Sequence, residues 1–387
     1  MPSVEPVMVG VLGGGQLGRM FVHAAQARGF RVAVLDPDVA SPAGAAADVH
    51  LQAAYTDAQA LAELQRLCRA VTTEFENVPA RAMCDLARTC TVAPGADAVE
   101  ICQHRAREKA AFAAAGVPCA PHALVQTAHH TANASMAALL PGILKTASLG
   151  YDGKGQADVS TLDELPAAWA SLGQAPCVLE QRLPLRHEIS VIVARGADGR
   201  SVHLPVQQNL HRAGILAVTQ VPAPDIEADV AARAVVLAGR MADSLQYVGV
   251  LCVEFFVLDD GSLVANEMAP RPHNSGHYSI DACDVSQFDL QLRTLVGWPL
   301  VAPRQHSAAV MLNLLGDLWF GAASDAPART PDWAAVLTLP GIHLHLYGKA
   351  EPRRGRKMGH LTVTAPDAAA ARATALRAAA LLGLAPF

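Results

Sequence analysis

A run of glycines between an apolar stretch and a helical pattern, at the start of the chain, constrains the fold most. Residues 7–12 are almost all apolar, three glycines follow, and "QLGRMFVHAAQARG" has the spacing of an amphipathic helix that ends at Gly29. Further strand patterns in "FRVAVLD", "AVTTEFENVP" and "CTVAPG" alternate with a helical pattern in "AQALAELQRLCRA". Strands that alternate with helices pair in parallel, so we expect an α/β domain over residues 1–104.

Beyond residue 104 the pattern changes to hairpins, glycine loops and longer helices. A charged and then apolar helix is expected in "HRAREKAAFAAAGVP", a hairpin in "ISVIVARGADGRSVHLPV" and a long helix in "EADVAARAVVLAGRMADSLQ". The last part has a strand–turn–strand pattern in "HLHLYGKAEPRRGRKMGHLTVT" and an alanine-rich helix. We expect a second domain over residues 105–302, divided into 105–178 and 179–302, and a small α+β domain over 303–387.

Length and charge narrow the class of protein. A chain of 387 residues is too long for one ordinary core, and its net charge of −5 argues against a nucleic-acid or anionic-lipid partner. The eight cysteines show no C-x-x-C spacing, which is typical of buried thiols in a reducing compartment. Neither a signal peptide nor an apolar window of about 18 residues is present, so we expect a cytoplasmic protein without a membrane partner.

The first glycine turn has the spacing of a dinucleotide-binding motif. Gly13, Gly15 and Gly18 form G-x-G-x-x-G after a strand, and Asp36 closes the next strand about 20 residues later. Alone, this motif predicts NAD. Free N–H groups at a helix N-terminus also suit any anion, including a nucleotide monophosphate or a bicarbonate-derived anion. A tight turn without a ligand is the third interpretation.

A second glycine-rich loop, "KTASLGYDGKGQ", does not have Walker A spacing. Its three glycines, together with Lys145 and Lys154, favour a flap that covers phosphate groups. A surface loop with solvated lysines is the alternative.

Two acids lie inside an apolar hairpin pattern. Asp260-Gly261 predicts a two-residue turn, which would place Glu254 directly opposite Glu267, with Cβ atoms about 5 Å apart. Two carboxylates in apolar strands require a positive neighbour, and oxygen ligands favour Mg²⁺, with Asn266 able to add an amide oxygen. A glutamate on the solvent face, or one paired with an arginine, is the alternative.

Polar and basic groups follow in two further segments. The loop after Glu267 carries many hydrogen-bond donors and is typical of a substrate clamp. A turn in the last part of the chain is either solvated or a pocket for a substrate phosphate. The loop residues are Arg271, His273, Asn274, Ser275 and His277, and the turn residues are Lys349, Arg353, Arg354, Arg356 and Lys357.

Taken together, these motifs resemble the ATP-grasp superfamily and, more narrowly, the 5-(carboxyamino)imidazole ribonucleotide synthetase family, the ATPase subunit of phosphoribosylaminoimidazole carboxylase. "GYDGKGQ" and "APRPHNSGH" in this order are its most specific strings, and the likeness extends from "GVLGGGQLGRM" to "HLYGKAEPRRGRKMGHLTV". The resemblance implies an ATP-grasp fold preceded by a Rossmann-like parallel α/β domain and followed by a small α+β domain. It also implies a homodimer and a mutase partner that receives the product.

The reaction implied by the resemblance is a carbon–nitrogen ligation in purine synthesis. ATP, bicarbonate and 5-aminoimidazole ribonucleotide would give 5-carboxyamino-imidazole ribonucleotide, ADP and phosphate through carboxyphosphate. Mg²⁺, or Mn²⁺, would assist.

The resemblance also implies roles for individual residues. ATP would contact Arg105, Lys145, Gly150, Tyr151, Asp152, Gly153, Lys154, Gly155, Gln156, Glu180, Gln181, Arg182, Leu183, Glu188, His211, Asn266 and Glu267, and the metal Glu254 and Glu267. The ribonucleotide would contact Gly15, Gln16, Leu17, Glu74, Asn274, Ser275, Lys349, Arg356 and Lys357. Catalytic roles would fall to Tyr151, Asp152, Lys154, Arg271, His273 and Asn274.

Three other functions remain compatible with parts of the sequence. The first glycine motif alone suits an NAD(P)-dependent oxidoreductase. The second loop and the paired acids suit another ATP-grasp enzyme, such as a formate-dependent transformylase or a biotin carboxylase. A nucleotide-binding module without catalysis is the third alternative.

Overall fold

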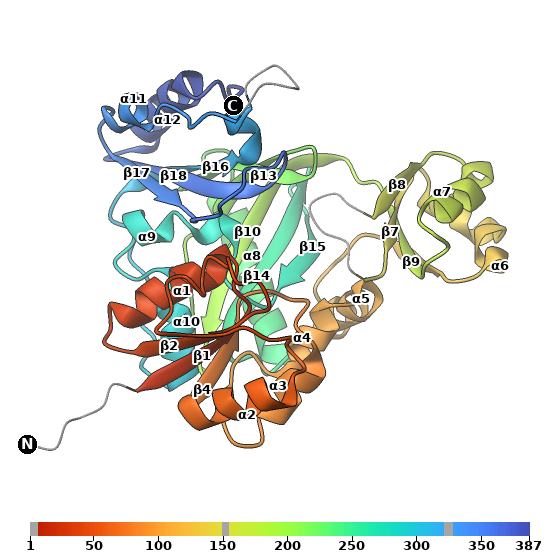
Figure 1. Ribbon diagram of the computed structural model, residues 1–387. Helices are drawn as coiled ribbons and strands as arrows, with labels where there is room; N and C mark the ends of the chain where they lie inside the picture. Colours follow the sequence, from red (N-terminus) through yellow and green to blue (C-terminus); the bar gives the residue numbers. More distant parts are fainter. Residues whose placement is uncertain (1–6, 149–154, 321–327) are drawn as a thin grey trace, which may run out of the picture.

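The computed structural model describes residues 7–148, 155–320 and 328–387. Its first part is a parallel sheet with the order β3-β2-β1-β4-β5, as the alternating pattern predicted. The strands are β1 (Met8–Leu12), β2 (Arg31–Leu35), β3 (Val49–Leu51), β4 (Ala70–Thr73) and β5 (Thr91–Val92). The helices around it are α1 (Gln16–Gln26), α2 (Ala58–Leu67), α3 (Ala80–Leu86) and α4 (Ala96–Cys102) (Figure 1).

The two faces of this sheet are covered by different helices. Side chains alternate along β1, so Val9 and Val11 pack toward α1, whereas Leu12 packs toward α2 and α3. The α1 face is also covered by α10 (Gln287–Val296), whose Phe288 is buried in the same apolar cluster. Gln291 of α10 donates to Thr73 O at 3.3 Å. A helix from far along the chain therefore fixes the first part against the rest.

A small antiparallel sheet forms a lobe that projects from the body of the molecule (Figure 1). The helix α5 (Arg105–Ala114) precedes it in the chain. Its strand order is β6-β9-β7-β8, and the lobe has its own core around Leu144 and Trp169. Its elements are β6 (His122–Val125), α6 (Ala128–Thr131), β7 (Gly142–Thr146), β8 (Gln156–Val159), α7 (Leu165–Ser171) and β9 (Cys177–Gln181).

The largest sheet contains nine antiparallel strands, in the order β15-β14-β10-β12-β13-β16-β18-β17 with β11 beside β10. It continues across the boundary expected at residue 303, because Val218 of β13 pairs with Leu312 of β16. The strands are β10 (Leu185–Arg195), β11 (Ser201–His203), β12 (Gln207–Arg212), β13 (Ile215–Val221), β14 (Gly249–Leu258), β15 (Leu263–Ala269), β16 (Ala308–Leu315), β17 (Ile342–Leu346) and β18 (Lys357–Ala365). The remaining helices are α8 (Ala228–Ser244), α9 (Ser279–Ala282), α11 (Trp333–Leu337) and α12 (Ala368–Leu381).

The prediction of a two-residue turn at Asp260-Gly261 is wrong. Leu258 N donates to Ser262 O at 3.0 Å, so the loop has three residues, and Gly261 takes the left-handed conformation (φ +77°) that such loops require. Near the loop the register is therefore shifted by one residue from the predicted one, with Phe255 opposite Ala265.

A β-bulge further along the same hairpin cancels this shift. Val253 pairs with Met268, so that Asn266 and Glu267 together face Glu254. The predicted juxtaposition of the two acids therefore exists, but the bulge produces it and the turn does not.

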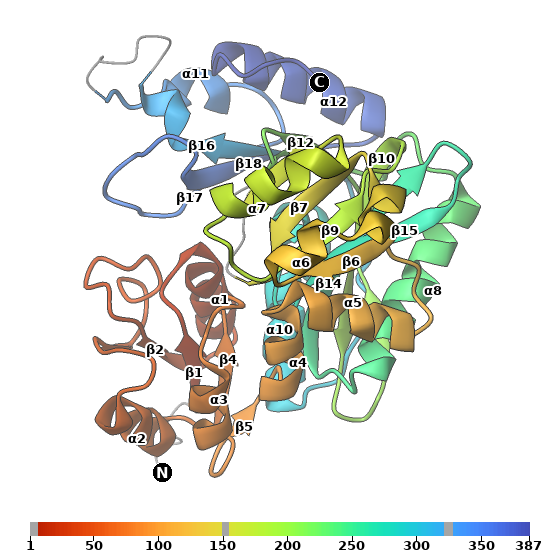
Figure 2. The ribbon, with the colours of Figure 1, turned by 90° about the vertical axis from the view of Figure 1, so that its right-hand side faces the viewer.

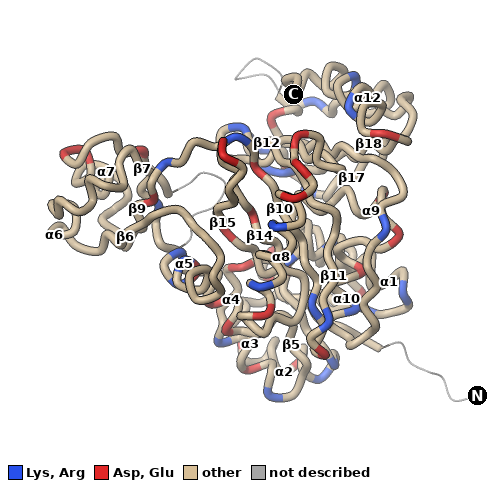
Figure 3. Tube along the Cα trace, turned by 180° about the vertical axis from the view of Figure 1, so that it is seen from behind, with Lys and Arg blue, Asp and Glu red and all other residues tan. Residues whose placement is uncertain are grey.

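The positions of Lys and Arg and those of Asp and Glu are interspersed along the trace in the view of Figure 3. Within the described part of the chain, no helix is both long and apolar enough to span a membrane.

We predict that Phe288→Ala lowers the free energy of unfolding by about 3–5 kcal/mol, because it empties space between α10 and the first sheet. Urea unfolding followed by circular dichroism measures the change. The exposed Val236, on α8, provides the control, since Val236→Ala should change this energy by less than about 0.5 kcal/mol. An unaltered urea midpoint for Phe288→Ala would contradict the role assigned to this packing.

Candidate functional site

A cavity of about 900 Å³ lies where the first sheet, the projecting lobe and the nine-stranded sheet meet. Figure 2 shows these three parts around the centre of the molecule. Of the residues that the sequence predicted for the site, those that line the cavity are Gln16, Leu17, Glu74, Arg105, Lys145, Gln156, Glu188, His211, Glu254, Asn266, Glu267, Arg271, His273, Asn274, His277, Lys349, Arg353, Arg354, Arg356 and Lys357. Residues far apart in the chain therefore converge on one space.

The paired acids lie on the wall formed by β14 and β15. Glu254 is nearly buried (side chain 12% exposed), whereas Glu267 is 45% exposed. Burial, and then the charge of Glu267, raise the pKa of Glu254. Glu254 Oε1 lies 3.4 Å from His273 Nε2, but it has no well-formed hydrogen bond among the described residues. Two close carboxylates, one with an unsatisfied oxygen, form a donor set that suits a divalent cation.

The sequence analysis also allowed a glutamate paired with an arginine, and the structure contains such a pair. Arg105, at the start of α5, has Nη1 3.5 Å from Glu267 Oε2. The guanidinium partly offsets the negative charge of the acid pair.

A buried network of charges lies beside this wall, under the lobe. Lys145 of β7 lies 3.1 Å from Glu180, and Lys109 of α5 lies 3.3 Å from the same carboxylate oxygen. Burial lowers the pKa of Lys145, and Glu180 opposes this effect. Glu180 therefore lies behind Lys145 and is not among the residues that line the cavity.

Glu188 and His211 form a second charged contact in the cavity. Burial alone would lower the pKa of His211, but its contact with Glu188, and the nearby Glu254 and Glu267, raise that pKa. The contact with Glu188 therefore stabilises the charged form of the imidazole against the effect of burial.

The first glycine turn binds the protein's own carboxylates. Gly14 N donates to Asp36 at 2.7 Å, and Gly15 N and Gly18 N donate to Glu74 at 2.8 and 3.1 Å. A Cβ at Gly15 would lie 2.4 Å from Glu74 Oε1, so only glycine allows this approach. Taken alone, the motif predicted NAD, whereas the family resemblance assigned this turn to the ribonucleotide substrate. The N–H groups that would receive a pyrophosphate are occupied, and the turn holds Glu74 at the cavity.

The loop after β15 presents polar groups to the cavity. Arg271 Nε donates to Glu76 at 2.5 Å, across the junction with the first sheet. Burial, and then the charge of Arg271, lower the pKa of His273 well below its ordinary value. Asn274 is only 7% exposed, and both atoms of its amide have no hydrogen-bond partner among the described residues. Its amide is free to bind a ligand, whereas Ser275 is buried and bonds to Ser190 at 2.7 Å.

The basic turn between β17 and β18 faces the cavity and is internally bonded. Lys349 Nζ donates to Lys357 O at 2.7 Å, and Arg356 Nη1 donates to Glu351 O at 2.8 Å. Arg353 and Arg354 line the cavity as well. The turn therefore brings several cations to the side of the cavity away from the lobe.

The remaining predicted residues fall into two groups. Gly15, Gly155, Gln181, Arg182, Leu183 and Ser275 are described but are not among the residues that line the cavity. Gly150, Tyr151, Asp152, Gly153 and Lys154 lie outside the described residues, so their roles stay predictions.

Three charged residues near the cavity, one half-buried and two buried, were missed by the sequence interpretation. They are Glu76, Glu108 and Lys109. The last two share a helical face with Arg105 and the core residue Phe112, at the spacing i, i+3, i+4 and i+7. This spacing was the signal that could have identified them.

A further group of ionisable side chains lies between α9 and the β17–β18 hairpin. His345 Nε2 is 2.9 Å from Asp281, and the rings of His345 and His360 stack at 4.5 Å with an interplanar angle of 12°. Ligand atoms of these residues lie within 4.8 Å of one another. Nearly parallel stacked rings do not direct their nitrogen lone pairs to a common point, so this group is a hydrogen-bonded His–Asp pair with a stacked neighbour.

Comparisons with known proteins agree with the expected fold. Three domain families match: the ribonucleotide synthetase preATP-grasp domain (residues 7–103), the ATP-grasp domain (110–288) and the phosphoribosylaminoimidazole carboxylase C-terminal domain (309–374). N5-carboxyaminoimidazole ribonucleotide synthase of Brucella melitensis is 44% identical over 92% of this chain and 96% of the relative. The Bacillus subtilis enzyme of the same name is 39% identical over 92% of this chain and 90% of the relative.

Solved structures extend this similarity. An ADP complex of N5-carboxyaminoimidazole ribonucleotide synthetase has a TM-score of 0.89 at 37% identity, over 98% of both chains. The Aspergillus clavatus synthase with ADP and 5-aminoimidazole ribonucleotide has a TM-score of 0.88 at 31% identity, over 98% of this chain and 99% of that one.

We predict that Glu254→Gln makes the metal-free protein more stable at pH 8 and has little effect at pH 5. The folded-state pKa of Glu254 is raised, so its contribution to stability is present below the ordinary value of 4.5 and is lost as the pH rises through the raised value. The amide is neutral throughout and avoids this loss. Thermal unfolding in EDTA across this pH range measures the difference. An equal difference in melting temperature at both pH values would contradict the prediction.

Proposed function

This chain belongs to the N5-carboxyaminoimidazole ribonucleotide synthase family of ATP-grasp ligases, and we propose that bicarbonate and carboxyphosphate supply the carboxyl group in its reaction. The reaction is the ATP-dependent carboxylation of 5-aminoimidazole ribonucleotide to its N5-carboxy product, in purine biosynthesis. The observation that carries the proposal is the single cavity that joins the acid pair of β14 and β15 to the basic turn. Phosphoryl transfer needs alignment and charge neutralisation more than a protein nucleophile, and this cavity supplies both.

The nucleotide occupies the side of the cavity beneath the lobe. Lys145 and Arg105, which line the cavity, face its phosphates. The resemblance to the family assigns the flap of residues 150–156 to the same phosphates and the segment 180–183 to the adenine. The Glu188 carboxylate, oriented by His211, accepts from the ribose hydroxyls. The burial of Lys145 supports this placement, because Glu180 is its ion-pair partner among the described residues and a buried cation gains from a further anionic ligand.

A divalent cation, Mg²⁺ or Mn²⁺, would be held by Glu254 and Glu267, with Asn266 beside them. The cation would neutralise charge on the terminal phosphates and align them for transfer. The unsatisfied oxygen of Glu254 supports this assignment.

The reacting carbon lies against the loop after β15. Arg271, held by Glu76, presents a fixed guanidinium to the anion formed from bicarbonate, and Asn274 offers an unpaired amide. His273, whose pKa is lowered by burial, stays neutral beside them. Tyr151, Asp152 and Lys154 of the flap complete the catalytic set in this proposal. Closure of the flap excludes water from carboxyphosphate.

The ribonucleotide spans the rest of the cavity. The carboxylate of Glu74, oriented by the N–H groups of the glycine turn, accepts from its ribose hydroxyls, with Gln16 and Leu17 beside it. Its phosphate binds the turn that carries Lys349, Arg356 and Lys357. The negative charge of Glu74 at one end of this part of the cavity and the positive charge of the basic turn at the other end orient the substrate.

A cytoplasmic location, a homodimer and transfer of the product to a mutase partner are further parts of the proposal. The resemblance to the family supports these three proposals.

We predict that ADP release requires both 5-aminoimidazole ribonucleotide and bicarbonate, and that Glu267→Gln lowers kcat at least about 100-fold, because the acid pair loses one of its two charges. A coupled assay for ADP, with a phosphate-release assay in parallel, measures both effects.

The alternative functions give different results in the same assays. Formate in place of bicarbonate should not support turnover, whereas a formate-dependent transformylase would use it. Thermal stabilisation by Mg·ATP and none by NADH would agree with the blocked glycine turn. ADP release that is independent of the ribonucleotide would contradict the proposed function.

A further inference from the structure

The strand that carries Glu267 lies at the edge of the nine-stranded sheet and is held from outside by α5 and the segment after it. Met268 N donates to Glu108 Oε1 at 2.6 Å, and Asn266 O accepts from Lys109 Nζ at 2.9 Å. Ala265 N donates to Pro118 O at 2.7 Å. Buried backbone groups without a partner are costly, so these bonds replace the missing neighbouring strand.

The two side-chain bonds lie on either side of Glu267. Asn266 O belongs to the peptide group that precedes the Cα atom of Glu267, and Met268 N belongs to the peptide group that follows it. A β-bulge interrupts the regular ladder at this point, so the ladder alone does not fix the orientation of these groups. Lys109 and Glu108 fix one peptide group each, and together they set the direction of the Glu267 side chain.

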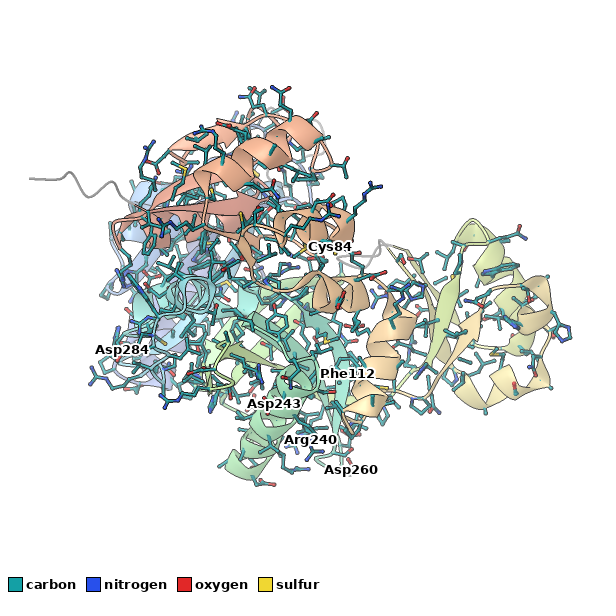
Figure 4. The ribbon with its side chains drawn as sticks, turned by 90° about the horizontal axis from the view of Figure 1, so that it is seen from below. Cys84, Phe112, Arg240, Asp243, Asp260 and Asp284 are labelled. Atoms are coloured by element: carbon teal, nitrogen blue, oxygen red, sulfur yellow. The ribbon has the colours of Figure 1, made fainter. Side chains whose placement is uncertain are left out.

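Both residues are firmly anchored. Glu108 is 3% exposed and Lys109 is fully buried, on the face of α5 that also carries Phe112. Phe112, labelled in Figure 4, packs in one cluster with Val253 of β14 and Ala234 of α8. The apolar contacts of α5 therefore hold Glu108 and Lys109 at a fixed position relative to β14 and β15.

Lys109 has a second partner, the Glu180 carboxylate at 3.3 Å. The same ammonium thus connects the bulge with the network around Lys145. A buried ammonium is expensive unless it is paired, and both of its partners lie at the edges of the nucleotide side of the cavity.

We propose that Glu108 and Lys109 are positioning residues that orient Glu267, and so set the separation of the two carboxylates that hold the divalent cation. This inference rests on the proposed metal role of Glu254 and Glu267. Neither positioning residue needs to touch the metal or the substrates.

The test compares substitutions that keep or remove each bond. Glu108→Leu removes the acceptor for Met268 N, and the affinity for Mn²⁺ in the ADP-saturated protein should fall about 10–100-fold. Glu108→Gln keeps an oxygen acceptor and should bind Mn²⁺ almost as the unmodified protein does. Electron paramagnetic resonance measures free Mn²⁺ in this titration. Calorimetry with ADP in EDTA should show nearly unchanged nucleotide affinity for Glu108→Leu.

Lys109 provides an independent pair of variants. Lys109→Met should also weaken Mn²⁺ binding, and Lys109→Arg should restore much of it, because a guanidinium can reach the same oxygens. In Lys109→Met, the magnesium concentration for half-maximal activity should rise as the affinity for Mn²⁺ falls.

Arg195 supplies the matched control. It is a buried cation that also bonds to one carboxylate, Asp243 at 2.8 Å, and one backbone carbonyl, Tyr247 O at 3.0 Å. Arg195→Met should lower the melting temperature as Lys109→Met does, but it should leave the Mn²⁺ affinity unchanged.

The outcomes separate this inference from the proposed function. The positioning role would be overturned if Glu108→Leu and Lys109→Met fold and bind Mn²⁺ as tightly as the unmodified protein. This conclusion would hold even if Glu267→Gln no longer binds Mn²⁺. The positioning role would also be overturned if Arg195→Met weakened Mn²⁺ binding to the same extent, because a general loss of stability would then explain the weaker binding. Absence of Mn²⁺ binding in the unmodified ADP-saturated protein would refute the metal site itself.

Discussion

Repulsion between two carboxylates in an apolar hairpin is the constraint on which the rest of the cavity depends. Glu254 and Glu267 face each other because of a bulge, and burial raises the pKa of Glu254 further. Charges of one sign interact strongly where water is excluded, so a stable arrangement needs positive charge nearby. Arg105 provides part of it, and a divalent cation with a nucleotide would provide the rest.

The other walls of the cavity extend this charge balance. The first sheet contributes Glu74 and Glu76, the lobe contributes Lys145, and the turn between β17 and β18 contributes several cations. Two packing features hold these distant groups at fixed positions relative to one another. Phe288 of α10 fixes the first sheet, and the continuous nine-stranded sheet fixes the basic turn relative to the acid pair. The geometry of the site therefore depends on contacts that are themselves far from the chemistry.

Intramolecular hydrogen bonds also occupy the glycine motif that, taken alone, predicted NAD. A glycine turn at a helix N-terminus attracts anions, and here the anions are carboxylates of the same chain. Glu74 is 59 residues from Gly15, so no local pattern shows that it occupies this position. The same physics that binds a pyrophosphate elsewhere serves here to orient a side chain at the cavity.

The sequence by itself determined the parallel α/β start, the hairpins and the polar segments, because side-chain periodicity and glycine placement act over a few residues. Many of the residues that its family-specific strings assigned to the site line the cavity, whereas Ser275 and the segment 180–183 do not. Only the tertiary structure decided the register of the acid pair, since a three-residue loop and a bulge shift it in opposite directions. Tertiary contacts likewise decided the burial of Glu108 and Lys109. A charged residue on a helix is buried only when a distant strand offers it partners, and here β15 does so.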